Sequence, residues 1–425
     1  MDTLNEAAPQ ATKSSARGGV DLRRIGLVWT ILLVPIETGI ALYLPDIRTS
    51  GYASTFVLML FDIPLLVLTA GALPSIVSRV RTRDFSLGVA TVLFLTAAAL
   101  VTLPFHPSRS GAGVVFRLAF AAVVAFEISG LSARAFRYRV GAPLLIGAAI
   151  QSTLGVMQVL NGGAIGLNRI GERSAFFEFG DVVGAQGTML HPYVLAGYAI
   201  LAATVGIATL PDGGQQRKVW LVGIGLAAVP LGITFSRSGA VGAIIVLGLL
   251  AYGAYRNRER YGAALIAMGV GALVPALLFS GGWLDRFDDS TRDGLDRSSS
   301  GRVTLIQQSF DLIESSPIVG VGPGRYAIVM EEDPTVLPQV VHNVPLLLAA
   351  ESGIVVGLAA LVLLLLLGYR ALRTSIAAAV VAAGLGVWMV FDKFTYLSPN
   401  GLVMFAIWLG VLDWLWTHRD TTEAA

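Results

Sequence analysis

Charged residues are scarce in this chain of 425 residues. Asp, Glu, Lys and Arg make up 14% of it and hydrophobic residues 55%, whereas about a quarter of a typical soluble domain is charged. The mean hydropathy is +0.71. This composition excludes an ordinary soluble domain and predicts a protein that lies in a lipid bilayer.

Cysteine is absent, and histidine occurs only four times. The lack of thiols excludes disulfides and thiolate metal sites, although it does not identify the compartment. The net charge of +2 says little about partners. The sequence also has no internal repeat and no low-complexity segment. Function must therefore be sought in the few polar residues that accompany the apolar runs.

Apolar runs of roughly 17 to 25 residues, long enough to cross a hydrocarbon core about 30 Å thick, recur along the whole chain. Because unpaired backbone groups are too costly in lipid, these runs must be helices. We predict an all-α integral membrane protein with about twelve transmembrane helices. They are placed at residues 25–44, 54–74, 86–104, 112–131, 140–160, 187–210, 219–235, 240–255, 262–280, 344–368, 376–394 and 401–417.

Basic residues gather in every second connection between the predicted helices. By the positive-inside rule these connections face the cytoplasm, and an even number of crossings places both termini there. The first helix follows a basic segment without a small-residue cleavage site, which indicates an anchor rather than a signal peptide. The basic residues are Arg79, Arg81, Arg83, Arg134, Arg137, Arg139, Arg217, Lys218, Arg256, Arg258, Arg260, Arg370 and Arg373, with Lys13, Arg17, Arg23, Arg24 and Arg419 near the termini.

The opposite face carries a medium loop, residues 161–186, and a large loop between the ninth and tenth helices, residues 281–343. Loops this long are usually functional. Within the large loop, Val303, Ile306, Phe310 and Ile313 recur at helical spacing, with serines before them and Pro317 after them. This pattern predicts an amphipathic helix over the membrane mouth. The "GVGPGRY" segment that follows predicts a turn back toward the bilayer.

The chain then divides into five parts. A cytoplasmic tail precedes nine transmembrane helices, the large partly helical loop follows, and three further helices and a short tail complete it. The boundaries are residues 1–24, 25–280, 281–343, 344–417 and 418–425.

Two residues on the predicted outer face could carry chemistry. His342 lies about one turn before the tenth helix, where an imidazole can accept a proton near neutral pH; it could equally be an interfacial residue next to a helix cap at Asn343. Arg237 is the only charge in the "FSRSGAVG" turn and runs against the positive-inside bias. Its planar guanidinium suits phosphate, and snorkelling to lipid headgroups is the other interpretation.

Other charges on this face are less specific. Arg302 opens the loop helix and Arg325 follows the glycine turn, while Arg169 and Arg173 lie in the medium loop; each could instead pair with a nearby carboxylate. The acidic run fits no calcium-loop spacing and indicates a solvated loop. It comprises Asp285, Asp288, Asp289, Asp293 and Asp296.

Three charges fall inside predicted helices, where ionisable groups normally face a bundle interior and pair. They are Asp62, Arg117 and Glu127. Arg117 and Glu127 are ten residues apart on one helix, a rise of about 15 Å, so each needs another partner. Both structural pairing and a role in transport or substrate handling would account for them.

In their order along the chain, these features resemble the O-antigen ligase and polymerase superfamily of bacterial envelope enzymes. The family pattern is an Arg-led loop helix, a Pro-x-x-Gly-x-Gly-x-Gly turn, and a His-Asn pair before a span that contains Glu-x-Gly. An earlier family motif, a His-Pro pair opening a span, is similar to His191 and Pro192 in "GTMLHPYVLAGYAIL". The later matches are Arg302, Pro317, Gly320, Gly322, Gly324, His342, Asn343, Glu351 and Gly353.

The resemblance implies an inverting glycosyltransferase at the outer face of the bacterial inner membrane that uses no nucleotide sugar, metal or other cofactor. The implied donor is a glycan on undecaprenyl pyrophosphate. The acceptor hydroxyl would belong to a glycolipid in a ligase, to another lipid-linked glycan in a polymerase, or to a protein in related oligosaccharyltransferases. Membrane lipid is an expected partner and nucleic acid is not.

Within this resemblance, His342 becomes the base that activates the acceptor hydroxyl. Arg237 and Arg302, with Arg325 third, bind the pyrophosphate and absorb its growing negative charge. Asn343, His191, Arg169 and Glu351 are secondary candidates for substrate binding.

Two alternatives remain at the level of sequence. Ligase and polymerase share these motifs, so the donor glycan and the acceptor stay open. A transporter or flippase for lipid-linked glycans would account for charges inside helices, but it calls for paired broken helices and two matching halves, neither of which the sequence shows.

Overall fold

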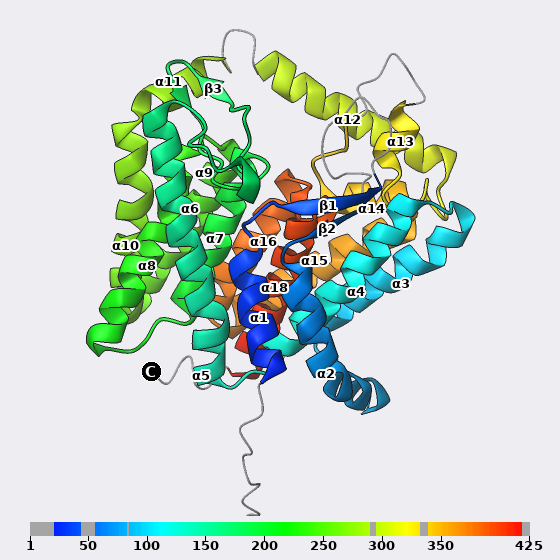
Figure 1. Ribbon diagram of the computed structural model, residues 1–425, viewed down its shortest axis with the longest axis horizontal. Coiled ribbons are helices and arrows are strands. Elements are labelled where there is room, and N and C mark those ends of the chain that lie inside the picture. Colours follow the sequence, from blue (N-terminus) through cyan, green and yellow to red (C-terminus); the bar gives the residue numbers. More distant parts are fainter. Residues whose placement is uncertain (1–20, 44–55, 83–84, 290–294, 332–338, 419–425) are drawn as a thin grey trace, which may run out of the picture.

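The structure is a computed structural model that describes residues 21–43, 56–82, 85–289, 295–331 and 339–418, without the side chains of residues 43, 289 and 295–300. Most of it is helical (Figure 1). The α-helices are α1 Leu22–Leu33, α2 Asp62–Thr82, α3 Leu87–Thr102, α4 Arg109–Ser129, α5 Ala133–Phe136, α6 Ala142–Asn161, α7 Pro192–Ala208, α8 Gly214–Ile233, α9 Arg237–Arg256, α10 Arg258–Leu278, α11 Ser280–Asp289, α12 Leu295–Ser315, α13 Tyr326–Glu331, α14 Val344–Ser352, α15 Ile354–Thr374, α16 Ile376–Phe391, α17 Phe394–Leu397 and α18 Pro399–Thr417.

Short elements complete the described chain. They are the 3-10 helices Leu103–Phe105 and Asn168–Ile170, the π-helical turn Arg137–Gly141, and the strands β1 Gly39–Tyr43, β2 Phe56–Met59, β3 Glu178–Phe179 and β4 Val182–Val183. β1 pairs antiparallel with β2, and β3 pairs antiparallel with β4. β3, α11, α12 and α13 lie at one end of the helices, whereas α5 lies at the other (Figure 1).

Eight helical segments of the described chain are long and apolar enough to cross a membrane. The expectation of a helical, multi-pass membrane protein is therefore supported. The count of twelve spans stays a prediction, because α7 and α16 are apolar but have only 17 and 16 residues. The eight segments are Asp62–Thr82, Leu87–Phe105, Arg109–Ser129, Ala133–Asn161, Arg237–Arg256, Arg258–Leu278, Ile354–Thr374 and Pro399–Thr417.

The prediction of one helix over residues 25–44 is wrong. α1 ends at Leu33, and the chain then turns and forms β1. Pro35 has no N–H to continue the helical ladder, and the Glu37 N–H donates instead to the Thr188 carbonyl over 3.1 Å. An apolar run does not distinguish a helix from a strand, and here the strand pairing prevails.

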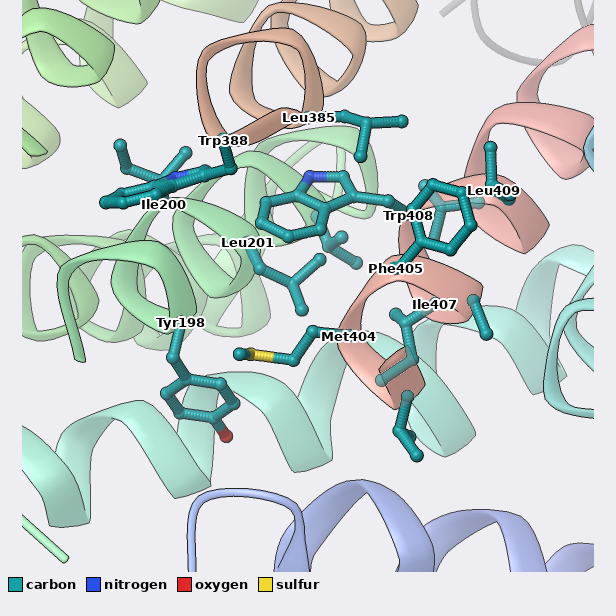
Figure 2. Packing of buried hydrophobic residues seen from close by; sticks show 14 of the residues in the cluster. Tyr198, Ile200, Leu201, Leu385, Trp388, Met404, Phe405, Ile407, Trp408 and Leu409 are labelled. Atoms are coloured by element: carbon teal, nitrogen blue, oxygen red, sulfur yellow. The ribbon is translucent and has the colours of Figure 1, made fainter. Parts of the chain in front are cut away.

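Two helices form the centre of the fold. All residues of α7 except Tyr193 are buried, and so are those of α18 from Pro399 to Leu415. Figure 2 shows Leu201 of α7 beside Trp408 of α18 and Tyr198 of α7 near Met404 of α18, in a cluster that also contains Trp388 of α16. A helix that is apolar on all sides is typical of such a central position. The amphipathic and lipid-length helices surround this pair.

The charges inside the predicted spans have partners in the structure. Arg117 bonds to the Asp62 carboxylate and to the Val57 carbonyl, so it ties α4 to α2 and β2. Glu127 accepts two bonds from Arg23, of 2.7 and 2.8 Å. Each of the three charges thus pairs across elements, as expected for ionisable groups in a bundle.

The tenth predicted span, residues 344–368, is not continuous but is interrupted at Gly353 between α14 and α15. Gly353 has a φ of 95°, and a Cβ there would lie 2.0 Å from the Ile318 carbonyl oxygen. The Ile354 N–H donates to the Pro317 carbonyl over 2.9 Å instead of continuing the helix. Only glycine permits this close approach of the loop backbone.

The glycine-rich turn is hydrogen-bonded to this break. Val321 and Gly322 donate N–H bonds of 2.9 Å to the Ala350 and Glu351 carbonyls. The Glu351 carboxylate accepts from the Gly324 N–H at 2.9 Å and from the Tyr326 N–H at 3.2 Å. The return of the large loop to the membrane, which the sequence predicts, is therefore built from backbone bonds to α14. We call this set of contacts the loop clamp.

The predicted amphipathic helix is α12, although it begins earlier than the serines expected to precede it. Leu305, Leu312 and Ile313 are buried, while Val303 and Phe310 are 53% and 59% exposed. The protein-facing stripe is thus rotated from the one predicted, and a second apolar stripe remains outward. The Tyr326 hydroxyl lies 2.9 Å from the Ser309 hydroxyl and fastens α12 to the end of the loop clamp.

The acidic run is not a solvated loop in the part of the chain that the structure describes. Asp285, Asp288 and Asp289 belong to α11, and Asp296 lies in α12. Asp293 lies outside the described residues, as do residues 1–20 of the predicted tail, Arg83, and residues 419–425 at the other end.

Removing the Glu351 carboxylate should destabilise the loop clamp. In Glu351→Ala two buried N–H groups lose their acceptor, and we expect a loss of about 1–3 kcal/mol, with Glu351→Gln intermediate because one carbonyl oxygen remains. The apparent unfolding midpoint in detergent, followed by tryptophan fluorescence, measures the effect. Glu314→Ala, on the exposed side of α12, is the matched control; equal midpoints for the two alanine variants would refute the contribution of the clamp.

Candidate active site

A pocket of about 500 Å³ lies at the end of the helices that carries β3, α11 and α12. Seven separate segments line it, and they include four of the residues predicted from the sequence. These four are His191, Arg237, Arg302 and His342. Arginines and histidines that are distant in the sequence therefore meet in one cavity.

Arg237 enters the pocket from the turn between α8 and α9. Ser236 caps α9 by accepting the Gly239 N–H over 3.2 Å, so Arg237 is the first helical residue. Its Nη2 donates to the Arg286 carbonyl at 3.4 Å, and its buried Nε has no partner among the described residues. An unsatisfied buried donor of this kind is suited to an anionic ligand.

The backbone before Arg237 is strained. Phe235 has a φ of 49° and is the only described residue other than glycine with a positive φ. Its ring packs against Phe179 and Trp283, with centroids 5.3 and 5.6 Å away. Such strain typically occurs at functional sites, where packing holds the backbone in place.

His342 is held by contacts on both of its sides. The Lys393 ammonium donates to the Val340 carbonyl at 2.9 Å, and the Asn343 amide donates to the Val390 carbonyl at 3.2 Å. The Asn343 side chain also accepts the Leu346 N–H at 2.9 Å and caps α14. The predicted helix cap at Asn343 is therefore present, and His342 beside it lines the pocket.

The imidazole of His342 is in its neutral form. Burial, with smaller contributions from Lys393, Arg302 and His191, lowers its pKa to about 3. Its Nδ1 is buried and has no hydrogen-bond partner among the described residues. A neutral ring with an unused nitrogen can accept a hydrogen bond from a ligand hydroxyl, and an anionic ligand beside the ring would raise its pKa and thereby its basicity.

His191 is placed by the start of α7. Its Nδ1 accepts the Tyr193 N–H over 3.3 Å, which requires that this nitrogen be unprotonated. The ring lies between Phe177 and Tyr193, with centroids 4.1 and 4.0 Å away. Burial, and then Arg173, Arg286 and Lys393, lower its pKa to about 3. His191 thus serves as a neutral helix cap whose ring forms part of the pocket wall.

Two charged residues of the pocket, Arg286 and Asp392, were not predicted from the sequence. Arg286 lies on α11 and its guanidinium is 4.9 Å from the Phe179 ring centroid. Asp392 follows α16 and accepts the Lys393 N–H at 2.7 Å, and burial raises its pKa to about 6. Arg286 lies within the acidic run that the sequence predicts to be a solvated loop. Asp392 lies within the predicted transmembrane helix of residues 376–394. Neither pattern indicates a pocket residue.

Four other predicted site residues do not line this pocket. Arg325 lies beside Gly322 in the glycine turn, and Arg169 is exposed in a 3-10 helix of the medium loop. Asn343 caps α14, and Glu351 belongs to the loop clamp. Their proposed roles in substrate binding stay predictions, while their visible contacts are with the protein itself.

The charge distribution of the pocket defines what it can bind. Arg237, Arg286 and Arg302 come from three different elements and face the same cavity as the neutral His342. Aromatic rings of Phe177, Phe179, Tyr193 and Phe235 form much of its wall. The Asp392 carboxylate faces the same cavity. With three arginines against one carboxylate, the arrangement suits a ligand with clustered negative charge, which would lie beside a neutral imidazole.

Residues 222–362 match a family model described as O-antigen ligase. This match supports the resemblance of the chain to the O-antigen ligase and polymerase superfamily. The matched range contains Arg237, Arg302 and His342, whereas His191 and Asp392 lie outside it. No curated protein matches the chain.

The low pKa values of the two pocket histidines can be tested directly. We expect 15N NMR of histidine-labelled protein in micelles to show His191 and His342 still neutral at pH 5, with His191→Gln and His342→Gln identifying the signals. Since the unfolded imidazoles, with pKa values near 6.5, bind protons that the folded ones do not, stability should fall as pH drops from about 6.5 toward 3. Protonation of both with midpoints near 6.5 would contradict the burial of these rings.

Proposed function

We propose that the chain is a membrane glycosyltransferase of the O-antigen ligase kind, with the match of residues 222–362 as the premise. It would transfer a glycan from a polyprenyl pyrophosphate to an acceptor hydroxyl, with inversion, at the outer face of the inner membrane. The observation that carries the proposal is the meeting of Arg237, Arg286 and Arg302 with His342 in one pocket.

The arginines fit the donor. As the glycosidic bond to pyrophosphate breaks, negative charge grows on the leaving diphosphate, and cations placed beforehand stabilise that charge. The buried Nε of Arg237 has no hydrogen-bond partner among the described residues. Arg302 has no ion-pair partner among the described residues either. Binding the diphosphate would provide these donors with acceptors without breaking an ion pair of either side chain.

His342 fits the acceptor. An alcohol is a weak nucleophile, and a base that removes its proton during attack contributes roughly 10²- to 10⁴-fold to the rate. The proton would pass from the hydroxyl oxygen to a ring nitrogen of His342, the oxygen would bond to the anomeric carbon, and the diphosphate would leave with the bonding electrons. A single displacement of this kind inverts the anomeric centre.

The location of the pocket suits a lipid-linked donor. It lies at one end of the membrane-length helices, as expected if a polyprenyl chain remains in lipid while glycan and acceptor meet in water. The prediction that the arginine-rich connections face the cytoplasm puts this pocket on the outer side. Asp62, Arg117 and Glu127, which would have favoured a transporter, form interhelical pairs.

Ligase and polymerase remain two forms of the proposed function. A strain that lacks the gene distinguishes them: long glycans missing from their anchor support a ligase, and single repeats left on the anchor support a polymerase.

Transfer by the purified protein tests the proposal. In liposomes that contain a polyprenyl-pyrophosphate glycan and an acceptor glycan, we expect transfer by the wild type, and a 10²- to 10⁴-fold lower kcat for His342→Ala. The product is measured by gel or mass spectrometry, with Arg258→Ala as a control at a distant exposed site. Movement of the lipid across the bilayer without transfer would refute the enzyme, and full activity of His342→Ala would refute the base.

Arg237→Lys should separate charge from geometry. An ammonium keeps the charge but cannot make the two parallel bonds of a guanidinium to a phosphate, so we expect transfer to fall at least about tenfold while folding is unchanged. The same assay measures kcat/KM for the donor. An activity equal to wild type would show that Arg237 does not bind the diphosphate through its planar group.

A further inference from the structure

A second cavity lies at the opposite end of the helices from the candidate active site. It has a volume of about 770 Å³, within the range of roughly 300–1,000 Å³ that is typical of ligand pockets, and it lies between α1 and the segment that contains α5 and the π-helical turn. Three arginines line it, Arg24, Arg134 and Arg139, together with Trp29 and Tyr138. We call it the α1 groove.

Among the described residues, only one of the three arginines of the α1 groove has an ion-pair partner. Arg139 forms an exposed 3.2 Å ion pair with Asp21. Arg24 and Arg134 have no ion-pair partner among the described residues and are exposed. The cavity on the other side of α1 differs, because Arg23 there pairs with Glu127 and Arg79 lies over the Phe126 ring.

The groove also has an apolar wall. Val28 and Trp29 follow Arg24 by four and five residues on α1, and therefore lie about 6–7.5 Å farther along the helix axis. Trp29 and Tyr138 are 52% and 42% exposed, although they are large aromatic residues. Aromatic rings of this kind are enriched where headgroups meet acyl chains.

Arg134 and Arg139 lie where we expect the edge of the membrane. They lie near the start of the 29-residue apolar segment Ala133–Asn161, which is long enough to span. We therefore expect the polar end of the groove at headgroup level and its apolar wall toward the acyl chains. A π-helical turn, Arg137–Gly141, carries two lining residues, and such turns occur frequently at functional sites.

From this geometry we propose that the α1 groove binds an anionic phospholipid of the leaflet opposite the candidate active site. The lipid phosphate contacts Arg24 and Arg134, and its acyl chains lie along Val28 and Trp29. Basic pockets between transmembrane helices bind anionic headgroups through this complementarity of charge. The site is independent of the glycan chemistry proposed above.

Native mass spectrometry of the delipidated full-length protein tests the proposal. We expect the wild type to bind dioleoylphosphatidylglycerol at least about tenfold more tightly than dioleoylphosphatidylcholine, and the double variant R24A/R134A to lose that preference. R256A/R258A is the matched control, because it removes two arginines from the far end of α9 and the start of α10. It should retain the preference.

Three results would overturn the proposal. An unchanged preference in R24A/R134A would show that these arginines do not bind the lipid, and an equal loss of preference in the control would indicate general surface charge. Displacement of the phospholipid by an equal concentration of glycerol phosphate would indicate a site for a soluble phosphate. This displacement measurement uses the wild type alone, so it decides even if the variant folds poorly; persistence of the phospholipid against glycerol phosphate supports the acyl contacts.

Discussion

The break at Gly353 is the constraint on which the end of the molecule with the candidate active site depends. Backbone groups within a membrane must be hydrogen-bonded by the protein, and the interruption between α14 and α15 needs new partners for its carbonyls and N–H groups. Pro317, Val321 and Gly322 supply them. The large loop and the interrupted span consequently determine each other's position.

From that constraint two site residues follow. Tyr326, whose N–H is bound by Glu351, holds α12 through Ser309, and α12 carries Arg302 to the pocket. The other partner in these hydrogen bonds is α14. This helix begins at the Asn343 cap, and His342 is the residue before that cap. His342 and Arg302, which are 40 residues apart in the sequence, are thus positioned by one connected set of backbone and side-chain hydrogen bonds.

Much of the candidate site could be predicted because its residues break local rules. Arg237 is the only charge in its turn and lies on the side opposite the arginine-rich connections, and His342 stands beside a helix cap at the start of an apolar run. Arg286 could not be predicted as a site residue, because an arginine among aspartates is expected to form local ion pairs. The strand β1 was predicted as part of a helix over residues 25–44. Its conformation depends on pairing with β2, and such a tertiary contact cannot be recognised from an apolar run alone. The rotation of α12 likewise depends on what packs against Leu305 and Leu312.

The left-handed backbone at Phe235 has a practical consequence for engineering. Glycine at a position of positive φ is a standard means of raising thermal tolerance, and here it would relieve strain of about 1–3 kcal/mol. The same replacement deletes the ring wedged between Phe179 and Trp283, which fixes the direction in which the chain enters α9. Truncating a buried aromatic side chain costs about 3–5 kcal/mol, more than the strain that glycine would relieve. The packing of the Phe235 ring, rather than its backbone conformation, therefore determines the stability of this turn and the position of Arg237.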